Sequence, residues 1–205
     1  MILLAIESSS TVCGAGIFSI NHPPIIKEKE GSRIHAEMLP VFVDDLLNEY
    51  DLSIKSFDGI AVSAGPGSFN GLRIGMSLAK GLAFAAEVPI LPVNTAHSFI
   101  SEGTSEKKYS LAIYSHSGLV YEQIVQGGKM VDDIQFHSIE NIESDQVLGI
   151  NFPDELQKKT EINKVMPSVK WIGNYAMKNS EELSGKSIQE ISPFYYSDFQ
   201  TGKIA

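Results

Sequence analysis

Apolar runs and helical stripes follow one another along the first hundred residues. Residues 2–6 are continuously apolar and end in Glu7 and three serines, which predicts a buried central strand followed by a polar turn. Further strands are expected at 12–20, at 24–31 (more exposed), at 57–65 and at 88–93. Helical spacing predicts helices over 35–50, with Pro40 in or near the first turn, from 69 to about 86, and briefly from near Asn94.

The order of these elements is β-β-β-α-β-α-β, which is typical of a mixed sheet with helices packed on it. After a polar stretch at 101–108 the pattern restarts with two strands around Ser117 and Gly118. A strand near 147–150 and helical stretches near 153–160 and 168–184 follow. We therefore expect an α/β protein of two halves, 1–104 and a smaller, less regular 105–205.

Composition narrows the function classes. The 205 residues are 43% hydrophobic and 20% charged, enough for a globular core, with a formal net charge of −9. Such an acidic chain is a poor stand-alone binder of nucleic acid. Cys13 is the only cysteine, which excludes an internal disulfide and a cysteine-based zinc site. The N-terminus has no basic region like that of a signal peptide, so we expect a cytoplasmic protein with no membrane span.

A glycine-rich turn joins the strand at 57–65 to the helix from 69. Gly65 and Gly67 flank Pro66, and Ser68 is an expected helix N-cap. Free N–H groups at such a turn can bind an anion, for which Gly65, Gly67, Ser68 and also Ser9 are candidates. The spacing of a Walker A motif is absent, and a tight strand-to-helix connection explains the turn equally well.

The helix that follows carries Gly71, Gly75, Ala79 and Ala83 at every fourth position. Glycine costs a helix about 1 kcal/mol relative to alanine, so this stripe indicates close approach of another element. That element is either a neighbour within the chain or a partner subunit. Arg73 and Lys80 lie on another face, where they contact an anion or a partner's acids, or are simply solvated.

Four segments together resemble the TsaB (YeaZ) family of tRNA threonylcarbamoyladenosine biosynthesis. They are "LAIESSS", "SRIHAEMLPVFVDDLL", "FDGIAVSAGPGSFNGLRIGMSLAKGLAF" and "VPILPVNT". The resemblance implies an ASKHA (actin-like, Hsp70-like) fold of two RNase H-like halves with mixed sheets flanked by helices. Two departures are Asn70, where the family usually has Thr, and Ser197 in the terminal "ISPFYYSDF", where it usually has Arg.

The resemblance also implies what this chain lacks. The paralogue TsaD carries the transferase reaction and binds metal through a Val-Asn-His-x-x-x-His segment. Thr95 and Phe99 stand at the two ligand positions here, and His97 falls between them. Phe cannot bind a metal and Thr is a poor ligand for a transition metal, so no metal and no catalytic residue is expected.

A partner subunit is therefore the expectation that the resemblance supports. It implies a heterodimer with TsaD, a homodimer when the chain is alone, addition of the ATPase TsaE, and tRNA reached only through the complex. No cofactor is expected on this chain by itself, whereas the complex uses ATP. The expected interface lies on the two helices of the first half and comprises His35, Glu37, Met38, Phe42, Gly71, Arg73, Gly75, Ala79, Lys80 and Ala83.

The alternative is a small ASKHA-type ATPase or kinase that uses the loop at 65–70. Ser8, Ser9 and Ser10 would then contact phosphate beside Glu7, where kinases of this fold place an acid. The competing interpretation is a strand-ending turn whose hydroxyls bond to the backbone. His35 and Glu37 likewise either shape a partner contact or cap their helix.

Overall fold

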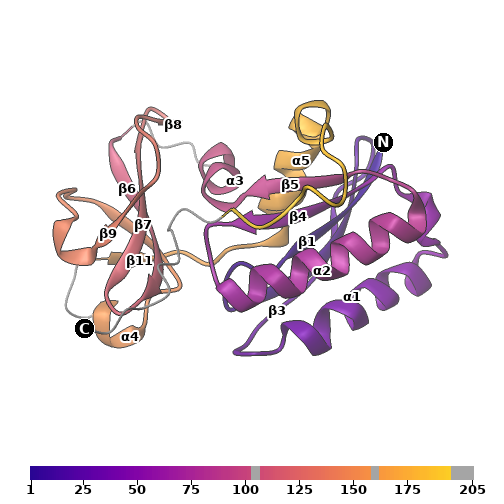
Figure 1. The fold of residues 1–205 in the computed structure, drawn as a ribbon, viewed down its shortest axis with the longest axis horizontal. Helices are drawn as coiled ribbons and strands as arrows, with labels where there is room; N and C mark the ends of the chain where they lie inside the picture. The colour runs from indigo at the N-terminus through magenta and orange to yellow at the C-terminus, as the bar shows by residue number, and fades with distance from the viewer. Residues whose placement is uncertain (103–106, 158–161, 195–205) are drawn as a thin grey trace.

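The computed structural model describes residues 1–102, 107–157 and 162–194. Within them the chain folds into two lobes, each built on one mixed sheet (Figure 1). The first lobe contains β1 (Ile2–Glu7), β2 (Val12–Ser19), β3 (Ile25–Glu30), α1 (His35–Glu49), a 3-10 turn (Ile54–Ser56), β4 (Gly59–Gly65), α2 (Phe69–Ala86), β5 (Ile90–Asn94) and α3 (Thr95–Glu102).

The second lobe follows the polar stretch after α3. Its elements are β6 (Tyr109–His116), β7 (Leu119–Gln126), β8 (Lys129–Met130), β9 (Gln135–Ser138), a 3-10 turn (Ile139–Asn141), β10 (Val147–Ile150), α4 (Asp154–Gln157) and β11 (Ile162–Lys164). The chain then returns to the first lobe as α5 (Val169–Leu183).

The two sheets repeat one topology. The first has the strand order β3-β2-β1-β4-β5 and the second β11-β10-β6-β7-β8, with β9 also paired to β7. In each sheet, a hairpin supplies two antiparallel strands. A later strand then pairs in parallel with the hairpin's first strand, and a further strand pairs in parallel with that one. This duplication confirms the expected fold of two RNase H-like halves, and the short β8, β9 and β11 are strands that the sequence pattern did not predict.

The sequence of each strand fits its place in the first sheet. Central β1 is buried on both faces, which explains its continuous apolar run. Edge strand β3 carries alternating Lys and Glu and is the most exposed strand of this sheet, as expected. Pro40 is the sixth residue of α1, just past the first turn and in keeping with the expectation, and Ala36, whose carbonyl it cannot pair with, is exposed to water.

Helices cover both faces of the first sheet. One core joins Leu4 and Ile6 to α1 and α2, which pack side by side, and the opposite core joins Leu3 and Ala5 to α5 (Figure 1). Helix α5 therefore packs on the first sheet although it follows the second sheet in the sequence. After α5, Ile191 returns to the α1–α2 side. Residues 158–160 of the expected fourth helical stretch, and Ser197, lie outside the described residues.

Candidate functional site

The turn after β1 and the loop before α2 pack directly on each other. The backbone N–H of Ser68 donates to the carbonyl of Ser9 at 2.7 Å. Gly67 lies so close that a Cβ there would meet the same carbonyl oxygen at 2.4 Å. Ser68 caps α2 as predicted, with its hydroxyl accepting from Gly71 N at 3.3 Å. The geometry is that of a tight strand-to-helix connection.

The polar groups that would cradle a phosphate are already bonded within the chain. Ser9 donates its N–H and its hydroxyl to Glu7 Oε1, at 2.5 and 2.6 Å. Ser10 Oγ accepts from Val12 N at 2.9 Å, and Ser8 N donates to Ser63 Oγ at 3.0 Å. Gly65, the remaining anion candidate, has a φ of +106° and packs against Leu72 and Phe194. These contacts fit the strand-ending turn better than a phosphate site.

Glu7 is the unusual charge of this region. Burial raises the pKa of its carboxyl to about 7, and the hydrogen bonds from Ser9 offset only part of that effect. Its Oε2 is buried and has no hydrogen-bond partner among the described residues. A carboxyl that titrates near neutral pH at the end of β1 couples the stability of this turn to pH.

The small-residue stripe of α2 faces inward. A Cβ on Gly71 would lie 2.1 Å from the carbonyl oxygen of Ser8, and one on Gly75 would lie 2.1 Å from Ser8 Oγ. Ala79 and Ala83 are fully buried in the core beneath α2. The stripe therefore serves close packing of α2 on the chain's own β1 turn, which is the first of the two alternatives that the sequence left open.

Two further residues of the expected interface are also buried and do not reach the surface. Phe42 belongs to the core, and His35 is buried with its Nε2–H donating to the carbonyl of Val12 at 3.2 Å. Glu37 and Arg73 are exposed, whereas Met38 and Lys80 are half-buried. Arg73 lies over the ring of Phe69, 3.8 Å from its centroid. Only these last four members reach the surface.

The outer face of α2 carries a different stripe, formed by Asn70, Arg73, Ser77, Gly81 and Phe84, all of which are exposed. Their spacing of three and four residues keeps them on one side of the helix. Phe84 is 75% exposed, and nothing lies within 4 Å of a Cβ added at Gly81. On adjacent α1, Val41 is 45% exposed. We call this surface of α1 and α2 the outer helix face. The spacing of the exposed α2 residues is visible in the sequence, but the Gly and Ala stripe on the inward side of the same helix is more conspicuous.

Thr95 and Phe99, the two positions where the resemblance predicts that metal ligands are missing, are engaged in packing. Phe99 meets Trp171 of α5 edge-on, with 4.9 Å between ring centroids. Thr95 is buried as the first residue of α3, and Asn94 Oδ1 accepts from His97 N at 3.1 Å. Burial lowers the pKa of the half-buried His97 imidazole. Within the described ranges, no three His, Cys, Asp or Glu residues gather closely enough to hold a metal ion.

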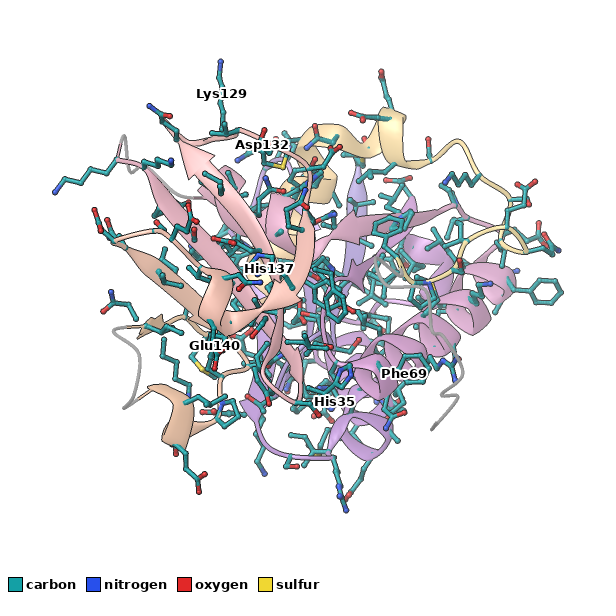
Figure 2. The ribbon with its side chains drawn as sticks, turned by 60° about the vertical axis from the view of Figure 1, so that its left-hand side comes forward. His35, Phe69, Lys129, Asp132, His137 and Glu140 are labelled. Carbon is teal, nitrogen blue, oxygen red and sulfur yellow. The ribbon has the colours of Figure 1, made fainter. Side chains whose placement is uncertain are left out.

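A cleft of about 970 Å³ lies where the two lobes meet. Its walls come from the loop before α1, the start of α2, the β6–β7 hairpin and Asn151 after β10. His35 and Phe69, which line it, appear below the strands of the second lobe in Figure 2. Asn151 ties the lobes together by donating from Nδ2 to the carbonyl of Ser9 at 3.0 Å.

Known proteins match this chain over most of its length. A family model described as TsaD, tRNA N6-adenosine threonylcarbamoyltransferase, matches residues 26–190. The tRNA threonylcarbamoyladenosine biosynthesis protein TsaB of Haemophilus influenzae is 33% identical over 92 residues, 45% of this chain and 39% of that protein. A tRNA N6-adenosine threonylcarbamoyltransferase of Staphylococcus aureus is 30% identical over 138 residues, 60% of this chain and 38% of that protein. The chain thus matches about two fifths of the length of these curated relatives.

The fold has a solved counterpart. The solved structure of YeaZ from Pseudomonas aeruginosa superposes with a TM-score of 0.75 at 22% identity, covering 95% of this chain and 99% of that one. Such a likeness shows the fold. Among the described residues, no helix is both long enough and apolar enough to cross a membrane.

Proposed function

The chain belongs to the family of the tRNA N6-adenosine threonylcarbamoyltransferase TsaD and its relative TsaB (YeaZ), and from this we propose that it is a non-catalytic partner subunit of TsaD. In the proposed complex with TsaD and TsaE, TsaD transfers threonylcarbamoyl to the adenosine next to the anticodon of tRNA. This chain would stabilise the active arrangement of TsaD, act in the cytoplasm and reach tRNA through the complex.

The observation that carries the proposal is the loss of both metal-ligand positions. Thr95 is buried at the start of α3, and the ring of Phe99 is engaged by Trp171. Neither side chain can supply the imidazole nitrogen that a transition metal prefers. A chain that keeps the fold of a metal-dependent transferase without these ligands is suited to a supporting role.

The outer helix face supports the proposed mode of assembly. Ser77 and Gly81 leave room for the backbone of a partner helix, while Phe84 and Val41 offer apolar side chains to bury. Exposed Phe84 would bury on the order of 150 Å² on association. We propose that helices of TsaD pack on this face, and that a second copy of the chain takes their place when TsaD is absent.

The proposed complex uses ATP, while this chain by itself holds no cofactor. The internal bonds of Ser9 and Ser68 support this division, because they occupy the donors that a phosphate would need. The alternative of a small ATPase using the loop at 65–70 loses support for the same reason. Calorimetry of the isolated chain with ATP and magnesium is expected to show no binding.

Co-purification with TsaD tests the proposed interface. We expect Phe84→Asp to abolish the complex, because a carboxylate would be buried against the partner without a counter-charge. Val131→Asp is the matched control, since Val131 is 51% exposed on the second lobe, and it should bind like the wild type. Circular dichroism checks that both variants are folded. A normal complex with Phe84→Asp would remove this face from the proposal, and no complex with the wild-type chain would refute the partner role itself.

A further inference from the structure

The cleft between the lobes differs in charge from the rest of the molecule. The chain has 25 acidic and 16 basic residues, yet no Asp or Glu is among the described residues that line the cleft. The cationic residues of this lining are Arg33 and Arg73. A concave wall with cations and without carboxylates focuses positive potential where the surface as a whole is negative.

Backbone strain marks the same walls. Arg33 and Asn151 both line the cleft and adopt the left-handed conformation, with φ of +61° and +63°. This conformation costs a residue such as Arg33 roughly 1 kcal/mol, and Arg33 is exposed where it lines the cleft. Arg33 makes no ion pair or hydrogen bond to another described residue, so its donors are available to a ligand.

Aromatic rings supply the second kind of surface. Tyr114 and Tyr121 of the β6–β7 hairpin and Phe69 of α2 line the cleft. Tyr121 is held by a tilted contact with Phe136, 4.7 Å between centroids, and Tyr114 by a similar contact with Phe152 at 5.6 Å. Each of these contacts holds a ring in place, and a ring held in place can stack with a base at little entropic cost.

Cationic groups beside aromatic rings are what single-stranded nucleic acid requires, because phosphates need charge and bases need stacking partners. A nucleoside triphosphate is less suited, since the donors of the adjoining turn are bonded to Glu7 and Ser9. An acidic peptide would use the cations but not the rings. The volume of about 970 Å³ is of the size that holds one or two nucleotides.

We propose that the cleft between the lobes binds a single-stranded segment of RNA, with Arg33 on its phosphates and Tyr114 and Tyr121 against its bases. The choice of RNA rests on the proposed function. The contact itself goes beyond that function, in which tRNA is reached only through the partner subunit. The acidic remainder of the surface keeps this contact local and makes it weak for the isolated chain.

Fluorescence anisotropy with a labelled anticodon stem-loop RNA tests the proposal, using the chain in its complex with TsaD. Arg33→Glu should weaken binding by about tenfold, the effect expected for one charged interaction with phosphate. Arg33→Gln should reduce the slope of log K against log salt by about 0.7, the change expected when one phosphate of a single strand is no longer neutralised. The matched control is Lys129→Glu, at the start of β8 and far from His35 and Phe69 in Figure 2, and it should change neither quantity.

Cross-linking gives a readout that does not depend on a variant. RNA that carries 4-thiouridine in its loop should cross-link to peptides containing Tyr114 or Tyr121. Three results would each overturn the proposal. The first is that Arg33→Glu and Lys129→Glu weaken RNA binding equally, and the second is that cross-links form only outside the cleft. The third is that a poly-glutamate peptide displaces the RNA and binds the complex as tightly as the RNA does. Complex formation with TsaD is unaffected by these outcomes, so a failed RNA contact and a failed partner role are distinguishable.

Discussion

Two glycines of α2 should respond in opposite ways to the same substitution. Gly71→Ala places a Cβ 2.1 Å from the carbonyl oxygen of Ser8, so helix and turn must separate by about 1 Å to reach an ordinary contact. The bonds Ser68 N to Ser9 O (2.7 Å) and Ser8 N to Ser63 Oγ (3.0 Å) resist that movement. Overpacking against backbone costs about 3 kcal/mol, at the upper end of its usual range, and helix propensity returns about 1 kcal/mol.

We therefore expect Gly71→Ala to lower the free energy of unfolding by about 2 kcal/mol and Tm by roughly 4–8 °C. Gly81→Ala is the matched control, because its Cβ meets nothing within 4 Å. It should gain up to about 1 kcal/mol from helix propensity. Urea denaturation followed by circular dichroism measures both. A Gly71→Ala variant as stable as the wild type would refute the inward placement of the stripe.

Two other perturbations test the turn after β1. The folded-state pKa of Glu7 is raised to about 7 from 4.5, so the stability that its neutral form contributes is complete below pH 4.5 and is lost as pH rises through 7. Glu7→Gln should flatten this loss, which amounts to about 3 kcal/mol; parallel pH profiles of unfolding for both proteins would contradict the assignment. Asn151→Ala removes the bond to the Ser9 carbonyl and strains the backbone at φ +63°, at a cost of about 2 kcal/mol. Asn151→Gly relieves that strain and should cost less; a thermal melt in which it loses more than Asn151→Ala would contradict this account.

Local patterns predicted the elements of the first lobe because each depends on nearby residues. The apolar run before Glu7 and the Ser68 cap are examples, since a buried strand and a helix start are specified within a few positions. The second lobe was less clear because its strands β8, β9 and β11 have only two to four residues. Runs that short contain no readable period.

Long-range packing could not be predicted in the same way. Helix α2 has small residues on two sides, Gly75 inward and Gly81 outward, and periodicity cannot say which side meets the sheet. The contact of Gly75 with Ser8, far away in the sequence, decides it. Similarly, α5 joins the first lobe because Gly173 leaves room for the ring of Phe18. The cleft is also invisible in sequence, since its walls are assembled from both lobes.

The central claim is that this chain supports a reaction that its partner performs. Reconstituted threonylcarbamoylation of tRNA tests it most directly, with the threonylcarbamoyl donor, ATP and TsaE present throughout. We predict no modified adenosine with this chain alone, little with TsaD alone, and full activity when both are combined. Modification by this chain without TsaD, or an activity of TsaD that does not change when the chain is added, would contradict the account.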